Sequence, residues 1–242
     1  MIRNYRDLTR LEMEQVNKDE TIVLIPLGAL EQHGNQAPLG TDDIIAEAMT
    51  DCIRRELEGE PASEDSDFPM LVFPVIPVGL STEHRNFCGS ITLKPDTYYH
   101  MLYDISTSLV HHGFKKLAFL VCHGGNAPIV QVLSRELRSE FGISPFILSS
   151  GAFSHPDVTA TISEGNIWDF HGGEMETSMV TGRGPFVWIK LDTSEAGIPT
   201  AFKDNQALRP YGNVSIGWVS EDWKTADGKP IGIGGAPVRR HG

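Results

Sequence analysis

The chain has 242 residues, of which 40% are hydrophobic, and it carries a formal net charge of −12 at pH 7. This charge excludes nucleic acid and anionic membranes as favoured partners, because phosphates and acidic headgroups would be repelled over most of the surface. Length and composition predict one large α/β domain over residues 1–242 and favour a soluble enzyme with a small-molecule substrate.

The N-terminal sequence and the cysteines bear on the cellular compartment. The first twenty residues show no basic-then-apolar signal pattern, and no apolar run of eighteen residues is present, so we expect a cytoplasmic protein with no membrane partner. The three cysteines, Cys52, Cys88 and Cys122, are an odd number without a C-x-x-C spacing. This pattern indicates reduced thiols, neither a disulfide framework nor a thiolate zinc site.

Strand-like and helical segments alternate along the chain. The pattern predicts strands at 21–27, 70–78, 116–122 and 145–149, with helices at about 44–57, 95–112 and 128–141. Such alternation is typical of βαβ units with right-handed crossovers, and it predicts a parallel sheet covered by helices on both faces. Beyond residue 181 the pattern weakens to one more strand over 186–191 and a loop-rich C-terminal segment from about 193.

A first polar cluster, LEQHGNQAPLGTDD, follows the apolar run TIVLIPL. Side chains directly after a buried parallel strand lie at its carboxyl end, where open α/β sheets bind ligands. Glu31 and His33 alternate by two, which keeps both on one side of an extended chain. Thr41 or Asp42 can cap the helix that follows. An E-x-H pair alone is also a common surface turn, so further clusters are needed to indicate a site.

A second cluster, VCHGGNAP, follows the strand-like run KKLAFLV. Its His123 again comes directly after a strand, and two glycines let the backbone pass close to a ligand or ion. Asn126 can cap the next helix. The simpler reading of this cluster is a glycine turn with an incidental histidine.

A third cluster, WDFHGGEMETS, places one imidazole and two carboxylates within six residues, at His171, Glu174 and Glu176. If the segment from Gly173 is helical, the two glutamates diverge by about 200° around the axis, so only one of them can face a common site.

The three clusters together supply imidazole and carboxylate donors without a thiolate. This donor set suits zinc, manganese or iron, and a carboxylate such as that of Asp42 can bridge two ions about 3.5–4 Å apart. A metal pair of this kind lowers the pKa of a bound water to about 7 and polarises a carbonyl, which is the equipment for hydrolysis.

At these residues the sequence resembles the creatininase (creatinine amidohydrolase) family. Its members carry E-x-H-G-x(7)-D, H-G-G-N or a related segment, and H-x-G-x-x-E-T-S; here the segments read EQHGNQAPLGTD, HGGN and HGGEMETS, in that order. The resemblance implies a three-layer α/β/α sandwich with a mostly parallel sheet. It also implies a homo-oligomer, commonly a hexamer.

The resemblance further implies roles for individual residues. It implies two divalent ions per subunit and His171 as the acid/base that serves the leaving group. The implied metal ligands, with Asp42 as the bridge, are Glu31, His33, Asp42, His123 and Glu176.

Four further residues are candidate substrate contacts. Trp168 and Asp169 resemble a tryptophan-aspartate pair of creatininase that precedes its third-cluster histidine, although here they lie one residue closer to His171. Ser81 and His84 belong to the segment PVGLSTEHRNFCGSITL, which resembles another loop of the family. His84 is equally consistent with an ordinary surface-loop histidine.

The second cluster separates this chain from creatininase proper. Creatininase has H-Y-E-N where this chain has H-G-G-N, so Gly124 and Gly125 replace a pocket tyrosine and a ligand acid. The H-G-G-N branches include formamidopyrimidine deformylases, the peptidase of mycofactocin maturation, and hydrolases that open the ring of an oxidised inositol. The resemblance thus favours a metal-activated water that opens a C–N bond of a cyclic amide or formamide.

Two alternatives stay open from the sequence. One is hydrolysis of a C–C bond in the ring of an oxidised inositol, for which the same activated water serves. The other is a metal-binding assembly subunit without catalysis, which would have no need of His171.

Overall fold

The chain folds into two compact units whose segments interleave along the sequence. The computed structural model describes residues 2–59, 69–150, 169, 171–182, 189–199 and 215–235, with only the backbone described at 58–59. The first unit, called the sheet unit, comprises Met1–Ala29, Asp42–Leu80 and Leu93–Phe153, and the second, called the loop unit, comprises Leu30–Thr41, Ser81–Thr92 and Ser154–Gly242.

The sheet unit is built on a parallel sheet of five strands in the order β1-β3-β2-β4-β5. In register, Val23 of β2 lies opposite Leu71 of β3 on one side and Leu117 of β4 on the other. The strands are β1 (Ile2–Asn4), β2 (Ile22–Leu27), β3 (Met70–Val72), β4 (Lys116–Val121) and β5 (Ser144–Ser149).

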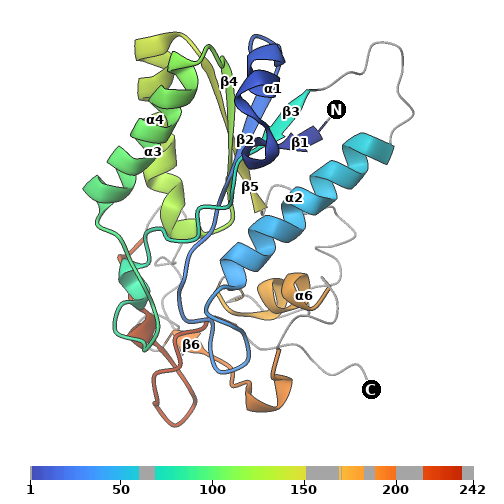
Figure 1. The fold of residues 1–242 in the computed structure, drawn as a ribbon. Coiled ribbons are helices and arrows are strands. Elements are labelled where there is room, and N and C mark those ends of the chain that lie inside the picture. Colours follow the sequence, from blue (N-terminus) through green and yellow to red (C-terminus); the bar gives the residue numbers. More distant parts are fainter. Residues whose placement is uncertain are drawn as a thin grey trace. The chain divides into compact units, whose positions relative to one another are not determined.

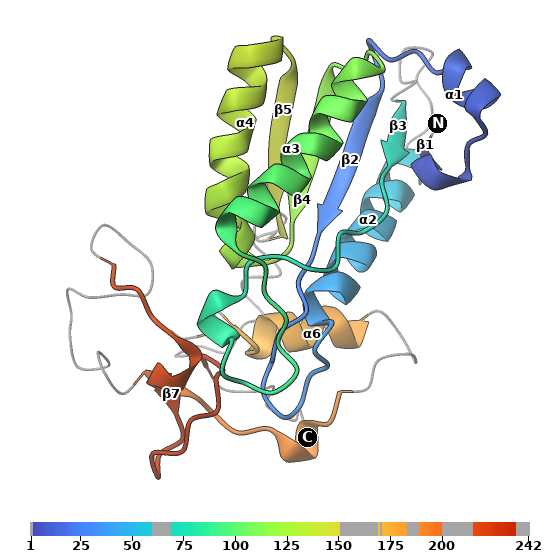
Figure 2. The same cartoon turned by 60° about the vertical axis from the view of Figure 1, so that its left-hand side comes forward.

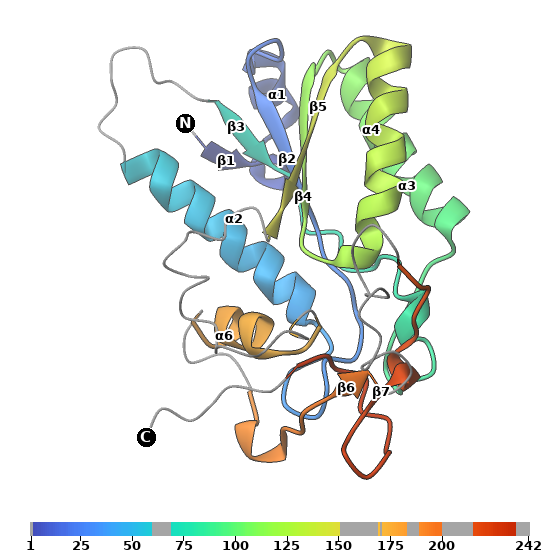
Figure 3. The same ribbon diagram turned by 180° about the vertical axis from the view of Figure 1, so that it is seen from behind.

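Helices cover both faces of this sheet (Figures 1, 2 and 3). Helices α3 (Pro95–His111) and α4 (Ala127–Phe141) lie on one face, and α2 (Thr41–Gly59) crosses the other, as Figure 3 shows from behind. The short helix α1 (Arg10–Gln15) packs Met13 against the buried cluster that contains α3 and α4. The predicted α/β fold with a parallel sheet is therefore confirmed.

The two faces divide the residues of each central strand. Val23, Ile25 and Leu27 of β2 belong to one buried cluster with side chains of α3 and α4, whereas Leu24 is equally buried and lies outside that cluster. Alternation of side chains between the faces of a strand explains this division. It also explains why TIVLIPL is apolar throughout, since a parallel strand covered by helices buries both of its faces.

The predicted strand over 70–78 is too long, because β3 ends at Val72. Pro26 of β2 has no N–H to donate, and Pro74 interrupts the neighbouring chain, so the ladder between the two strands cannot continue regularly. The pairing resumes only as single contacts, in which Ile76 donates its N–H to the carbonyl of Pro26 and accepts the N–H of Gly28.

Other boundaries also differ from prediction. Helix α2 already begins at Thr41, so Thr41 and Asp42 lie within its first turn, and the Thr41 hydroxyl donates to the carbonyl of Pro38. Residues 186–188 of the predicted strand over 186–191 lie outside the described residues, and Leu191 itself begins a 3-10 turn, Leu191–Thr193. Strand β1 and helix α1 are found where the sequence predicted no element.

The topology brings two predicted site segments together within the sheet unit. Strands β2 and β4 are hydrogen-bonded neighbours, yet the helices that follow them, α2 and α4, cover opposite faces of the sheet. Between two such strands the connecting loops diverge and leave room for a ligand at the carboxyl edge. Asp42, at the start of α2, and His123, after β4, both lie at this point.

The loop unit holds short elements in its described part. They are the 3-10 turns Thr82–His84, Leu191–Thr193 and Ser220–Asp222, helix α6 (Glu174–Gly182), and the antiparallel pair β6 (Ile198–Pro199) and β7 (Trp223–Lys224). Trp223 and Val180 are fully buried in this unit. Among the helices of both units that the structure describes, none is long and apolar enough to cross a membrane.

Candidate metal centre and active site

In the sheet unit, Asp42 and His123 form a buried carboxylate-imidazole pair. His123 Nδ1 lies 3.4 Å from Asp42 Oδ2, and the two side chains are 5% and 1% exposed. The other ring nitrogen, Nε2, lies 2.6 Å from the carbonyl oxygen of Leu80. A carbonyl can only accept, so Nε2 carries a proton, and in the neutral ring Nδ1 presents its lone pair toward Asp42.

Asn126 fixes the loops around this pair and does not cap α4. Its side chain makes no capping bond to the helix. Instead its Oδ1 accepts the N–H of Leu80 at 2.9 Å, and its Nδ2 donates to the carbonyl of Gly28 at 3.0 Å. The asparagine of H-G-G-N thus ties the loop after β2 to the segment whose carbonyl orients His123.

Asp43 is half-buried beside Asp42 and packs against Gly28. Burial, with the charges of Asp42 and Glu47 next, raises the pKa of Asp43 to about 7. A Cβ atom added to Gly28 would lie 2.0 Å from Asp43 Oδ1, so a larger residue at that position would displace the Asp43 carboxylate.

In the loop unit, Glu31 and His33 lie on the same side of the chain, as their spacing predicts. His33 Nδ1 is 3.1 Å from the main-chain carbonyl of Glu31, so this nitrogen donates and Nε2 keeps its lone pair. His33 Nε2 lies 3.9 Å from Glu31 Oε1 and 3.6 Å from Glu176 Oε2. Glu176 also accepts the N–H of Gly172 at 2.6 Å, which orients its carboxylate.

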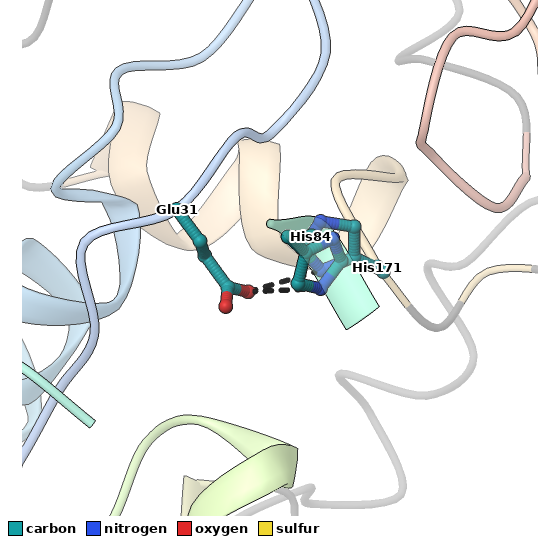
Figure 4. Close-up of side chains that lie close together, drawn as sticks. All are labelled: Glu31, His84 and His171. Carbon is teal, nitrogen blue, oxygen red and sulfur yellow. Dashed lines mark ion pairs between the residues drawn. The ribbon is translucent and has the colours of Figure 1, made fainter. Parts of the chain in front are cut away.

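Two further histidines of the loop unit meet at the carboxylate of Glu31 (Figure 4). Glu31 Oε1 lies 3.3 Å from His84 Nε2 and 3.5 Å from His171 Nδ1. The two imidazole rings stack with their centroids 4.0 Å apart and their planes 28° from parallel. The close-up shows both rings turned toward the same carboxylate oxygen, although they come from segments 87 positions apart in the sequence.

The donor atoms of the loop unit fit a divalent cation. Two groups, Glu31 with His84 and His171, and His33 with His171 and Glu176, each bring one ligand atom per residue to within 4.8 Å of the others. Nitrogen and carboxylate oxygen without thiolate suit zinc, manganese or iron. The side chain of Glu31 is fully buried, and a buried carboxylate is costly unless a cation or a hydrogen-bond donor compensates its charge.

The residues predicted to contact the substrate lie in different environments. Ser81 and His84 are both buried, so His84 is not an exposed loop histidine. Asp169 Oδ2 accepts the N–H of Met175 at 3.0 Å, which gives this residue a structural part at the start of α6. Burial first, then the charges of neighbouring glutamates, raises the pKa of Asp169 to about 7. Trp168 lies outside the described residues.

Sequence reasoning missed two buried polar residues next to these histidines. Gln32 places its side-chain nitrogen 3.0 Å from His84 Nδ1 and 3.1 Å from His171 Nε2. The hydroxyl of Ser220 also contacts His84 Nδ1. The position of Gln32 between two predicted ligands was a signal for its importance, but strict alternation would have turned it away from them.

The sequence profile of the creatininase family, described as creatinine amidohydrolase, matches residues 6–240. The match covers nearly the whole chain. This chain belongs to the creatininase family.

Creatininase-family relatives are found among characterised proteins. The mycofactocin precursor peptide peptidase of Mycobacterium ulcerans is 30% identical over 175 residues, which cover 72% of this chain and 63% of the relative. The creatinine amidohydrolase of Pseudomonas putida is 28% identical over 213 residues, which cover 81% and 77%. The chain therefore spans less than two thirds of the length of the peptidase it matches.

Solved creatininase structures share the fold of this family member. A Zn-Zn form of a creatininase variant superposes with a TM-score of 0.70 at 21% identity and covers 98% of this chain and 89% of that one. A manganese form gives a TM-score of 0.65, also at 21% identity, over 96% and 87%. At this level of identity the structural similarity supports the fold alone, so the chemistry must be argued from the residues of the site.

Proposed function

We propose that this creatininase-family chain is a metal-dependent hydrolase that opens a C–N bond of a small-molecule amide. The observation that carries the proposal is the buried cluster of the loop unit, in which His33 presents Nε2 to the carboxylates of Glu31 and Glu176. The other ring nitrogen of His33, Nδ1, donates to the main-chain carbonyl of Glu31, an arrangement that commonly orients metal-binding histidines.

The proposed ligands of a dinuclear centre are those that the motif resemblance implies. They are Glu31, His33, Asp42, His123 and Glu176, and these residues would hold the two ions. Support comes from the family assignment and from the chemistry of the donors within each unit. Zinc, manganese and iron all suit such donors, and zinc and manganese occur in the structural neighbours named above.

A bound divalent ion would lower the pKa of a coordinated water to about 7 and polarise the scissile carbonyl. The chain's own residues would then orient the substrate and move protons. His171 holds a proton on Nε2 against the carbonyl of Gln32, at 2.8 Å, and faces Glu31 with Nδ1. We assign Nδ1 of His171 as the atom that takes up a proton and delivers it to the departing nitrogen. Ser81, His84, Trp168 and Asp169 remain the proposed substrate contacts.

The scissile amide has two candidate settings. The motif resemblance favours a cyclic amide or a formamide. The 30% identity to a peptide peptidase favours a peptide amide as the second candidate. In either case we propose a cytoplasmic homo-oligomer, and light scattering would show whether it is the hexamer that the motif resemblance implies.

A turnover screen with matched variants tests the proposal. Metal-free protein would be reloaded with Zn²⁺, Mn²⁺ or Fe²⁺ and offered creatinine, a formamide and a short peptide. We expect turnover of one substrate class that chelation abolishes. His33→Ala should lose bound metal, and His171→Ala should keep metal but lose turnover, whereas the exposed control His100→Ala should keep both. Turnover that survives complete metal removal would refute the proposal.

A further inference from the structure

The side-chain amide of Gln32 has one orientation that its backbone neighbours allow. Its Oε1 lies 3.0 Å from the N–H of Gly34, and its Nε2 lies 2.5 Å from the carbonyl oxygen of Gly232. A backbone N–H can only donate and a carbonyl can only accept, so the amide oxygen and nitrogen cannot be exchanged. The residue is 5% exposed, and Gly232 is required there because an added Cβ would lie 2.6 Å from Gln32 Nε2.

This orientation fixes the proton on His84. Gln32 Nε2 lies 3.0 Å from His84 Nδ1, and an amide nitrogen only donates, so Nδ1 must be the acceptor. The proton of a neutral His84 is therefore on Nε2, which lies 3.3 Å from Glu31 Oε1. The hydroxyl of Ser220, which also lies at Nδ1, can donate to the same lone pair.

The main chain of the same residue fixes the proton on His171. His171 Nε2 lies 2.8 Å from the carbonyl oxygen of Gln32 and must donate to it. The 3.1 Å approach between His171 Nε2 and Gln32 Nε2 then joins two donors, so the second amide hydrogen of Gln32 is directed to His84 Nδ1 at 3.0 Å, which is closer than the Ser220 hydroxyl oxygen at 3.4 Å. The remaining nitrogen of His171, Nδ1, faces Glu31 Oε1 at 3.5 Å with its lone pair.

We propose that Gln32 is a positioning residue that sets opposite proton positions on two stacked imidazoles facing one carboxylate. His84 then donates a hydrogen bond to Glu31 and does not serve as a metal ligand, while His171 turns Nδ1, and not its protonated Nε2, toward the same carboxylate. The catalytic consequence rests on the proposed hydrolase function. The proton positions themselves do not, because they follow from hydrogen-bond polarity alone.

Long-range 1H–15N spectra of the histidine rings test the proton positions directly. The signals are assigned from those lost in His84→Gln and His171→Gln. In the metal-free wild type we expect Nδ1 of His84 as an unprotonated nitrogen, far downfield, and Nε2 of His171 as a protonated one. In Gln32→Glu, recorded at a pH high enough to ionise the new buried carboxyl group, no hydrogen remains to be donated, and the proton of His84 should move from Nε2 to Nδ1.

Gln36→Glu is the matched control. Gln36 is 1% exposed in the same segment and donates to the carbonyl of Gly172 at 2.7 Å, so the same change introduces a similar buried charge. It should leave the proton positions of His84 and His171 unchanged. If Gln32→Glu does not fold, Gln32→Met replaces it, and there the downfield shift of His84 Nδ1 should change because the amide donor is lost.

Metal affinity gives a second readout. We expect Gln32→Glu to change Zn²⁺ affinity by about 10–100-fold, the usual effect of losing a partner that orients a ligand. His84→Gln should retain the wild-type Zn²⁺ stoichiometry. A proton on Nδ1 of His84 in the wild type, loss of a Zn²⁺ equivalent in His84→Gln, or an unchanged His84 spectrum in folded Gln32 variants would each overturn the inference. The expected proton positions in a protein that binds no Zn²⁺ would refute the proposed function while upholding the role of Gln32.

Discussion

Asn126 offers the sharpest test of how the site of the sheet unit is held in place. Its side chain is fully buried and bonds the N–H of Leu80 and the carbonyl of Gly28. Asn126→Ala removes both partners and leaves two buried backbone groups unsatisfied, each at a cost of about 1–3 kcal/mol. We therefore expect the free energy of unfolding to fall by about 2–6 kcal/mol, measured by urea denaturation of the metal-free protein.

The same substitution should also weaken metal binding, because the segment that it frees carries the carbonyl that orients His123. Asn17→Ala serves as the control, since Asn17 is exposed in the same unit and its change should stay within about 0.5 kcal/mol. A loss below about 1 kcal/mol for Asn126→Ala would refute the bridging role. So would a stability loss equal to that of the control.

Three further predictions concern the thiols, one carboxyl group and one glycine. Burial raises the pKa of the Cys122 thiol. Iodoacetamide at pH 8 should therefore label the exposed Cys52 and Cys88 in the native protein and reach Cys122 only after unfolding. Labelling of Cys122 in the native protein, detected by peptide mass, would contradict its burial. Burial raises the pKa of Asp169 to about 7. The stability that the protonated carboxyl group contributes is therefore fully present below about pH 4 and is lost as the pH rises through 7. In thermal melts of the metal-free protein, Asp169→Asn should therefore gain stability over the wild type from pH 5 to pH 8, and a constant difference would refute this assignment. Gly142 ends α4 with φ of 66°, so Gly142→Ala should cost about 1–2 kcal/mol in urea denaturation, and a neutral effect would refute the strain argument.

The sheet could be predicted from sequence where local pattern and tertiary environment agree. The apolar runs of β2 and β4 are buried on both faces, and the strands begin and end within a residue of prediction. Strand β1 has only three residues and is defined by its pairing with β3, which no local pattern carries. The early end of β3 depends on Pro74 in its own segment and on Pro26 in the neighbouring strand, and the effect of Pro26 could be predicted only with knowledge of which strands are adjacent.

The candidate site divides in the same way. The spacing of Glu31 and His33 predicted that they share a side, because that relation is local. Gln32 was missed because its partners His84, His171 and Gly232 lie 52, 139 and 200 positions away. From the sequence, only Glu31 and His33 of this extended segment are predicted site residues, whereas the role of Gln32 follows from contacts of its amide with distant loops.

The histidines show what a motif can and cannot encode. His33, His123 and His171 each hold one ring nitrogen against a backbone carbonyl and leave the other for a carboxylate. Nδ1 of His33 donates to the carbonyl, whereas Nε2 donates in the other two histidines. The motifs therefore predict which histidines belong to the site, and the loop conformation determines which ring nitrogen faces the carboxylate. In the neutral form each ring keeps its proton away from the neighbouring carboxylate, so a cation at that carboxylate would meet a lone pair without the ring having to turn.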